Sequence, residues 1–459
     1  MTIHVGPIHD TAPRDFIVSA PGKIILFGEH AVVYGKLAIA APIGMRTFLY
    51  VETSTSTTPC RKLTLHFHDI GLEHSWNLSC LPWSIAYGAR YRVSKKTLTS
   101  TIIPELKHAL EPLILTVSPH HDETTQRVHR TAASTFLYMF MLLANPFSAS
   151  CTYHLRSTIP VGAGLGSSAS IAVCFSTALL VQYSHLSLPG ECSDDVDVMY
   201  SLGSINEWAL LGEISMHGQP SGIDNMVATV GKVISFRKGG GGEHAGLQVE
   251  ALDRFPELLV LIANSMQSRS TALEVRKVLD GKTREPQATE TILNAIDHIA
   301  ELALMKIASH KDGKTAEGGE KRALVRQLGH LMHMNHGLLV ALGVSHPKLE
   351  HIRDLVDSTG HGFTKLTGAG GGGCTISLLE HERGSREVVA IEERLRGNGY
   401  QAHVTTLSKY GVGFCALEEC AGGKGFDKAA FIRGGEAVEV ERAAVYRPSA
   451  HDSVWKFWD

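Results

Sequence analysis

A glycine- and serine-rich segment, Gly162–Ala169 (GAGLGSSA), is the first candidate for chemistry. It follows the alternating stretch 151–157, which predicts a strand, and it precedes the apolar stretch 170–183, which predicts a buried helix. Glycines at alternate positions let backbone N–H groups converge, and the following helix aims its positive end at the same place. The segment therefore predicts a polyphosphate site, in which the Ser167 and Ser168 hydroxyls contact a phosphate oxygen or Mg²⁺.

The glycine spacing of this segment excludes two common phosphate loops. Its third glycine comes too early for the dinucleotide-binding pattern GxGxxG, and the chain contains no GxxxxGK[ST]. A glycine turn that serves only close packing is the remaining alternative. The adjacent serines and the position between a strand and a helix favour phosphate binding over it.

Two further segments carry polar residues where they are unusual. Lys23, Glu29 and His30 interrupt the apolar run 20–36, so they either face a polar pocket or extend to solvent. Glu213, near the end of a predicted helix, and Asp224, in a Gly/Pro/Ser-rich loop expected to enter a strand, lie eleven residues apart. One carboxylate is suited to Mg²⁺ and the other to a substrate hydroxyl. A surface carboxylate and an Asx turn are the plain alternatives.

A second glycine run, Gly368–Gly373, lies between residues typical of strands. Six small residues in a row would weaken an ordinary strand, but they allow the backbone to come very close to a phosphate or to another loop. A flexible linker is the alternative, and the β-type residues on both sides argue against it.

The elements that must position these residues follow from periodicity and turn signals. The N-terminal half predicts a strand over 16–19 that ends at the turn 20–22, short strands and turns over 23–50, and a polar connection over 117–130. It also predicts helices over 104–115, 132–144 and 196–216, and a strand or hairpin over 227–236. The C-terminal half predicts strands over 258–263, 402–407 and 412–416, helices over 292–308, 323–342 and 349–358, and a surface-packed tail over 421–459.

Length and composition indicate a globular protein with more than one domain. The chain has 459 residues, and the glycine run 239–242 predicts a connection between domains at 1–240 and 241–459. A net charge of −3 gives no basic surface for nucleic acid. Eight cysteines without CxxC or zinc-ligand spacing, and the lack of a secretory signal, predict reduced thiols in the cytoplasm. The most apolar stretch, 136–144, is too short to span a membrane. The 25 histidines are interpreted as scattered core and surface residues.

Together these segments resemble the GHMP kinases. PGKIILFGEHAVVYG, PVGAGLGSSAS and KLTGAGGGGC match the three motifs of that family in order, over roughly residues 16–416. GEHAVVYGK, GEISMHGQPSGIDN and NSMQSRST resemble its mevalonate kinase branch. The resemblance implies an α+β fold of two domains, with a ribosomal-protein-S5-like N-terminal domain, a ferredoxin-like C-terminal domain and the active site between them.

The resemblance also implies roles for individual residues. Asp224 would be the catalytic base on the 5-hydroxyl of mevalonate, with Lys23 beside it. Ser168 and Glu213 would bind Mg²⁺. ATP would contact Lys23, Ser157, Gly162, Ala163, Gly164, Leu165, Gly166, Ser167 and Ser168, and the substrate would lie near Glu29, His30, Arg269 and Thr271. One departure concerns the nucleotide, because Asp69 stands where the family often has an asparagine.

The expected reaction is ATP-dependent phosphorylation of mevalonate to 5-phosphomevalonate, by a cytoplasmic homodimer that binds neither nucleic acid nor membrane. Two alternatives stay open. One is another GHMP kinase that acts on phosphomevalonate or a sugar, against which the GEHAVVYGK segment speaks. The other is a non-catalytic ligand sensor, which would be expected to lack Lys23, Ser168, Glu213 or Asp224, yet all four are present.

Overall fold

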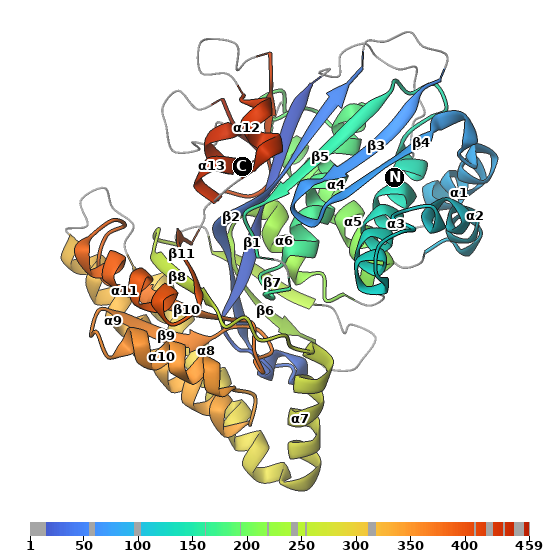
Figure 1. Cartoon of the computed structure of the whole chain (residues 1–459). Helices are drawn as coiled ribbons and strands as arrows, with labels where there is room; N and C mark the ends of the chain where they lie inside the picture. The colour runs from blue at the N-terminus through green and yellow to red at the C-terminus, as the bar shows by residue number, and fades with distance from the viewer. Residues whose placement is uncertain are drawn as a thin grey trace.

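A computed structural model describes most of the chain. The described residues are 15–54, 60–95, 102–160, 162–192, 194–217, 220–239, 247–252, 255–310, 318–407, 410–418, 426–434, 437–444 and 454–458. They form two β-sheets with helices packed on them (Figure 1).

The larger sheet has nine strands in the order β13-β12-β1-β2-β5-β3-β4, and β6 pairs with β2 and β7 with β6. Apart from the parallel pair β3–β5, its pairings are antiparallel. The strands are β1 (Phe16–Phe27), β2 (Ala38–Thr53), β3 (Lys62–Phe67), β4 (Leu72–Asn77), β5 (Cys151–Ser157), β6 (Val233–Lys238), β7 (Leu247–Leu252), β12 (Gly413–Ala416) and β13 (Lys456–Phe457).

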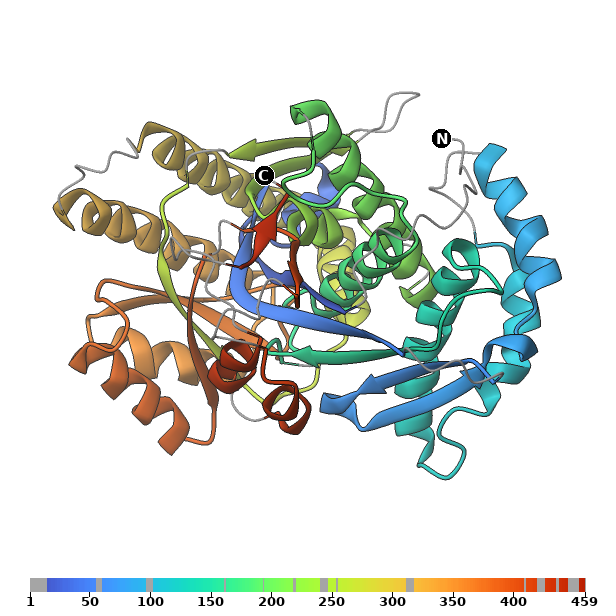
Figure 2. The ribbon, with the colours of Figure 1, turned by 90° about the horizontal axis from the view of Figure 1, so that it is seen from above.

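Helices cover both faces of this sheet. On one face, an apolar core joins Leu65 and Phe67 of β3 to Phe136 of α3 and Phe175 of α4. That layer contains α1 (Trp83–Lys95), α2 (Pro104–Leu115), α3 (Glu123–Leu143), α4 (Ser167–Gln182), α5 (Asp195–His217) and α6 (Ile223–Val230). On the other face, α12 (Lys428–Arg433) and α13 (Ala437–Ala443) pack on Phe48 and Tyr50 (Figure 2).

The smaller sheet is antiparallel, in the order β11-β8-β10-β9. Its strands are β8 (Leu259–Asn264), β9 (Gly362–Leu366), β10 (Cys374–Leu379) and β11 (Gln401–Thr406). Between β8 and β9 lie α7 (Thr271–Arg284), α8 (Pro286–Ser309), α9 (Gly318–Ala341) and α10 (Pro347–Asp357), and α11 (Arg386–Gly397) joins β10 to β11. This βαββαβ order is ferredoxin-like, which confirms the expectation for this part of the chain.

The turn predicted at 20–22 is wrong, because β1 continues through it to Phe27. A proline is tolerated there because the pairing of β1 with β2 shifts register between Pro21 and Lys23, and β12 pairs only with residues 16–19. Lys23 N–H is thus turned away from the sheet and donates to Leu165 O at 2.8 Å. The short strands predicted over 23–50 are likewise replaced by β1, the 3₁₀ turn η1 (Ala31–Tyr34) and the 16-residue β2.

Two predicted non-helical segments are helices. The polar connection over 117–130 ends at Asp122, whose side chain caps α3 by accepting from the N–H groups of Thr124 and Thr125. The strand or hairpin predicted over 227–236 is α6 followed by β6, so Asp224 lies in the first turn of a helix and not in a loop. The positive φ of +79° at Gly222 starts that helix.

The C-terminal part of the chain returns to the larger sheet. β12 and β13 extend it beyond β1, and the buried Arg46 of β2 donates to Tyr410 O at 3.0 Å. Residues of both predicted domains, 1–240 and 241–459, therefore build one sheet, and the boundary at 240 stays a prediction. Of its glycine run, 239–242, residues 240–242 lie outside the described residues. In the part of the chain that the structure describes, no helix combines the length and the apolar character needed to cross a bilayer.

Candidate active site

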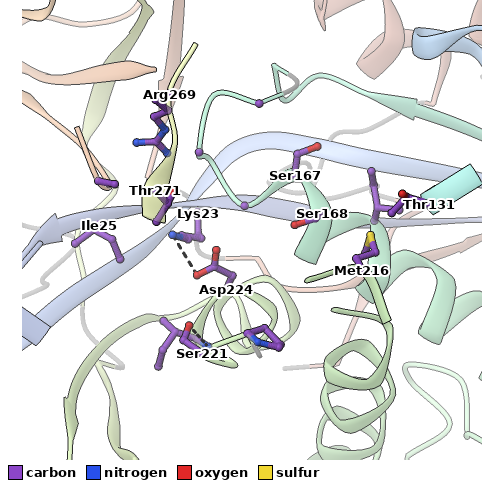
Figure 3. Close-up of a pocket in the computed structure, with 18 of the residues that line it drawn as sticks. Lys23, Ile25, Thr131, Ser167, Ser168, Met216, Ser221, Asp224, Arg269 and Thr271 are labelled. Atoms are coloured by element: carbon purple, nitrogen blue, oxygen red, sulfur yellow. Dashed lines mark hydrogen bonds and ion pairs between the residues drawn. The ribbon is translucent and has the colours of Figure 1, made fainter. Parts of the chain in front are cut away.

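One cleft of about 1330 Å³ gathers most of the predicted site residues. It is lined by Lys23, Glu29, His30, Ser157, Gly162, Gly164, Gly166, Ser167, Ser168, Asp224, Arg269 and Thr271. Ala163 and Leu165 are buried in the turn of the glycine loop, and Glu213 is buried beside Ser168. Figure 3 shows Ser168 between two ends of the cleft, with Thr131 and Met216 at one end and Ile25 and Thr271 at the other.

The glycine loop is held by backbone geometry that only glycine adopts readily. Gly162, Gly164 and Gly166 have φ values of +71°, +77° and +72°. Gly166 begins α4, whose first two residues, Ser167 and Ser168, line the cleft. The helix N-terminus and its unpaired N–H groups make this end of the cleft attractive to anions.

Arg269 joins the two glycine-rich segments. A Cβ added at Gly164 would lie 1.4 Å from its Nη2, and one at Gly368 would lie 2.9 Å from its Nη1. The guanidinium donates to Thr367 O at 3.4 Å. Burial lowers the pKa of Arg269, yet an arginine keeps its charge. A partly buried cation therefore lies against the loop that predicts phosphate binding.

The second glycine run packs closely against neighbouring backbone and side chains. A Cβ at Gly370 would lie 2.0 Å from Val344 O, and one at Gly371 would lie 2.3 Å from Glu274 Oε1. Gly373 N–H donates to Gln267 O at 3.0 Å. The alternative of a flexible linker is therefore wrong, and the close approach is to helix α7 and to other loops.

Gly164→Ala is expected to lower kcat/KM for ATP at least about tenfold more than Gly162→Ala does. Both alanines would need a left-handed backbone, at a cost of about 1–2 kcal/mol each. Only the Gly164 substitution displaces Arg269, because nothing lies within 4 Å of a Cβ at Gly162. Steady-state kinetics on the two variants measure the difference, and equal losses would contradict a role of Arg269 at the loop.

Lys23 and Asp224 form an ion pair in the middle of the cleft, with 3.1 Å between Nζ and Oδ1 (Figure 3). Lys23 lies on β1, where the pairing with β2 shifts register, and Asp224 lies in the first turn of α6. The side chains are 10% and 35% exposed, so the lysine is nearly enclosed while the carboxylate faces the cleft. A substrate hydroxyl at Asp224 would lie next to a fixed positive charge.

Glu213 lies next to Ser168 because α5 packs closely on α4. Gly212 allows this approach, since a Cβ there would be 3.3 Å from the Ala172 Cβ. Burial raises the pKa of Glu213 to about 7, and the hydrogen bond from Ser168, which lowers that pKa, only partly offsets the rise. Among the described residues, its Oε1 has no hydrogen-bond partner. A buried carboxylate oxygen without a partner, beside a hydroxyl and Asp224, fits the oxygen ligands that Mg²⁺ prefers.

Glu29 lies at the edge of the cleft, but its carboxylate is already bound by other side chains. It forms an ion pair with the fully buried Lys365 of β9, and it accepts from Asn335 Nδ2 at 3.0 Å. Burial lowers the pKa of Lys365, and Glu29 opposes that shift. Through this ion pair, Glu29 joins the segment 20–36 to β9 of the smaller sheet.

Glu29→Gln is expected to lower the free energy of unfolding by about 3–5 kcal/mol, because it leaves the buried Lys365 charge without a counter-charge. Glu392→Gln is the matched control. Glu392 makes a single contact with Arg396, four residues later on α11, and that arginine is 59% exposed, so its loss should cost under about 1 kcal/mol. Urea unfolding measures both. A variant of unchanged stability with a raised KM for the alcohol substrate would instead indicate that Glu29 contacts substrate.

His30 and Thr271 lie at the Ile25 end of the cleft. His30 has a φ of +60°, a conformation unusual for a non-glycine residue, and its Nε2 lies 2.8 Å from Ala369 O. Burial lowers the pKa of His30, so the ring is neutral near pH 7. Thr271 begins α7, next to the capping residue Ser270.

Sequence reasoning missed the apolar end of the cleft. Its lining includes Phe67, Ile70, Val128, Leu155, Ile171 and Phe175. These residues come from two strands, two helices and the turn η2 (His68–Ile70), so no local pattern in the sequence marks them. Such a wall is suited to a flat apolar ring system.

Asp69 lies at this end and holds Ser157 in place. Its Oδ2 accepts from Ser157 N–H at 2.6 Å, and its Oδ1 accepts from Arg156 Nη1 at 2.6 Å. The residue that departs from the family pattern thus forms an ion pair with a buried arginine. A negative carboxylate at this position is balanced before any ligand binds.

Comparisons with known proteins agree with these features. The family model described as GHMP kinases N terminal domain matches residues 130–232, and the one described as GHMP kinases C terminal matches residues 321–397. The chain is 42% identical to mevalonate kinase ERG12 of Gibberella zeae, over 96% of this chain and 87% of that protein. It is 41% identical to mevalonate kinase erg12 of Aspergillus fumigatus, over 98% of this chain and 83% of that protein.

A solved structure shares the fold. The crystal structure of mevalonate kinase from L. major in complex with R-mevalonate superposes with a TM-score of 0.59 at 22% identity, over 89% of this chain and 98% of that chain. The predicted α+β fold of the GHMP kinases is thereby confirmed. With its ordered motifs gathered in one cleft, and relatives above 40% identity over nearly its whole length, the chain belongs to the mevalonate kinase family of the GHMP kinases.

Proposed function

We propose that this enzyme transfers the γ-phosphoryl group of ATP to the 5-hydroxyl of mevalonate and releases 5-phosphomevalonate and ADP. The observation that carries the proposal is the Lys23–Asp224 ion pair, which lies next to the Ser168–Glu213 pair and the glycine loop in one cleft. A phosphate loop, a candidate metal site and a candidate base are thus adjacent. The relatives named as mevalonate kinases support the choice of alcohol.

ATP would bind across the cleft from its apolar end to the glycine loop. The wall around Phe67 and Phe175 suits the adenine ring, and the loop N–H groups with Ser167 suit the phosphates. Arg269 adds a positive charge at Gly164. Ser168 and Glu213 would hold Mg²⁺, which neutralises phosphate charge when it is bound.

Asp224 would accept the hydroxyl proton as the new O–P bond forms and the bond to the ADP oxygen breaks. Phosphoryl transfer has a loose transition state, so the proton leaves late and Asp224 need not deprotonate the hydroxyl beforehand. Lys23 stabilises the negative charge that develops on the attacking oxygen. His30 and Thr271 line the end of the cleft where the rest of the alcohol substrate would lie.

A coupled ADP-release assay across mevalonate, phosphomevalonate, homoserine and galactose tests the reaction. Mevalonate alone should give turnover well above the rate without an alcohol. Faster turnover of another alcohol would favour a different GHMP kinase, and no turnover with any of them would favour a ligand sensor.

We further propose that the enzyme is a cytoplasmic homodimer with domains at 1–240 and 241–459. Leu302, Met305 and Met334 expose apolar surface along α8 and α9, which a subunit contact would cover. No disulfide joins the cysteines among the described residues, which suits a reducing compartment. Light scattering tests the homodimer, cell fractionation tests the cytoplasmic location, and limited proteolysis tests the domain boundary. A monomer in light scattering would contradict the homodimer.

A further inference from the structure

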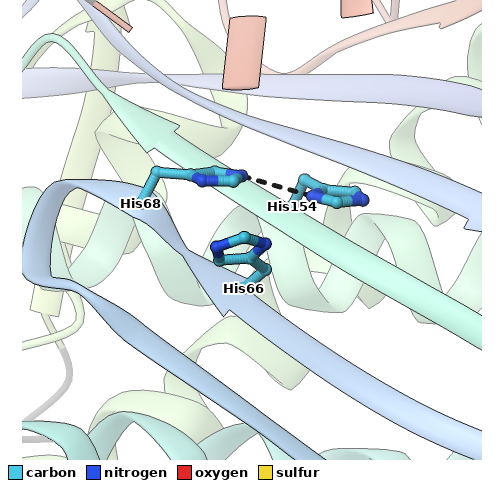
Figure 4. Close-up of side chains that lie close together, drawn as sticks. All are labelled: His66, His68 and His154. Atoms are coloured by element: carbon cyan, nitrogen blue, oxygen red, sulfur yellow. Dashed lines mark hydrogen bonds between the residues drawn. The ribbon is translucent and has the colours of Figure 1, made fainter. Parts of the chain in front are cut away.

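Three histidines gather on the face of the larger sheet that is turned away from α3–α6 (Figure 4). His66 of β3 and His154 of β5 are direct neighbours across the parallel strand pair, and His68 follows in the turn η2. Their neighbours Phe67 and Leu155 face the helical core on the opposite side. The alternation of the two strands therefore places the three rings together.

The ring nitrogens have the spacing of metal ligands. His68 Nε2 and His154 Nδ1 lie 3.2 Å apart, and one ligand nitrogen from each of the three rings lies within 4.8 Å of the others. Two nitrogens bound to a tetrahedral Zn²⁺ at 2.0–2.1 Å are about 3.3 Å apart. The His68–His154 pair already matches that edge, and the farthest nitrogen must approach by at most about 1.5 Å.

The surroundings suit a metal as well. Glu52 Oε2 lies 3.3 Å from His154 Nε2, so a carboxylate orients the ring whose other nitrogen faces His68. The His66 side chain is 30% exposed, which leaves an entry path from solvent.

We propose that His66, His68 and His154 form a binding site for one divalent transition-metal ion of the Zn²⁺ class, with solvent as the fourth ligand. The Cys/His spacing in the sequence did not reveal it, because His154 lies 86 residues after His68. This ion would tie β3 to β5 next to Asp69, which holds Ser157 at the edge of the cleft. The site is separate from the Mg²⁺ site and does not depend on the proposed reaction.

A hydrogen-bonded histidine pair without a metal is the alternative, and the chain contains a comparison for it. His381 Nε2 lies 3.1 Å from His361 Nδ1, and this pair belongs to no group of three candidate ligands among the described residues. A contact of two imidazoles alone therefore does not make a site. The third ring distinguishes the proposed one, since His381 also has a carboxylate, Glu387, 3.8 Å from its outer nitrogen.

The test is a titration of the chelator-treated, desalted full chain with Co²⁺ and, separately, Zn²⁺. One equivalent of Co²⁺ should give the visible absorption of a four-coordinate complex, and Zn²⁺ should displace it. His66→Gln and His68→Gln should remove that equivalent, and Glu52→Gln should weaken it roughly 10–100-fold. Zn²⁺ should raise the unfolding midpoint of the wild type and not that of the His66 variant.

His361→Gln is the matched control, because it removes one ring of the other histidine pair and should leave Co²⁺ binding unchanged. Circular dichroism and metal-free unfolding midpoints show that each variant is folded. His66 is less buried than His154 and provides a variant if His154→Gln does not fold. Less than one equivalent in the wild type, or the same affinity in His66→Gln, would overturn the proposal.

Discussion

Asp224→Asn is expected to lower kcat at least about 1000-fold while KM for ATP changes less than about threefold, since base catalysis contributes roughly 10²–10⁴. The amide keeps the shape of the side chain and its contact with Lys23, 3.1 Å away. It can neither take the hydroxyl proton nor balance the lysine charge. The phosphate loop and Glu213 are unchanged, so ATP binding should persist. Rapid-quench and steady-state kinetics with mevalonate measure both quantities.

Asp354→Asn is the matched control for this variant. It makes the same chemical change at an exposed carboxylate on α10 that does not line the cleft, and it should leave kcat within about twofold. Near-normal turnover by Asp224→Asn would rule out the base role. Equal loss of ATP binding and turnover would instead point to a structural role for the Lys23–Asp224 pair.

The motifs could be found from the sequence because each has a local cause. A glycine loop needs positive φ and free N–H groups within a few residues, and Gly162, Gly164 and Gly166 show that requirement in their spacing. The same holds for α4, whose apolar and small residues are buried on most sides of the helix. The ferredoxin-like order of the smaller sheet followed from the resemblance rather than from periodicity.

Features that depend on distant contacts could not be predicted. Glu29 looked like a pocket residue, and only the fold shows that Lys365, 336 residues later, binds its carboxylate. Pro21 resembled a turn because a local pattern does not show where β12 stops pairing with β1. A strand over 412–416 was predicted, but its return to the first sheet was not, since that depends on pairing with β1 and on contacts of Arg46 with backbone near residue 410.

Glu213→Gln is expected to reduce kcat/KM for Mg·ATP by about 100-fold or more, in the range seen when one electrostatic group at a transition state is removed. The buried Oε1 without a described partner is the oxygen best placed to bind the ion. Ser168→Ala should have a smaller effect of about tenfold, because water can replace a hydroxyl ligand more easily than a carboxylate. Activity measured against free Mg²⁺ concentration separates metal use from nucleotide binding.

The raised pKa of Glu213 gives this prediction a second signature. Burial stabilises the protonated form up to about pH 7, and a metal ligand must be deprotonated. The Mg²⁺ concentration for half-maximal activity should therefore rise as pH falls through about 7 in the wild type. Glutamine has no proton to lose, so the Mg²⁺ concentration for half-maximal activity of Glu213→Gln should not change with pH near 7. Because the carboxylate is missing, that concentration should also be higher than in the wild type at every pH. An unchanged Mg²⁺ requirement in both Glu213→Gln and Ser168→Ala would show that the ion is held elsewhere. The Glu213 carboxylate is only 5% exposed, so if it binds the ion, its removal must change the Mg²⁺ requirement measurably.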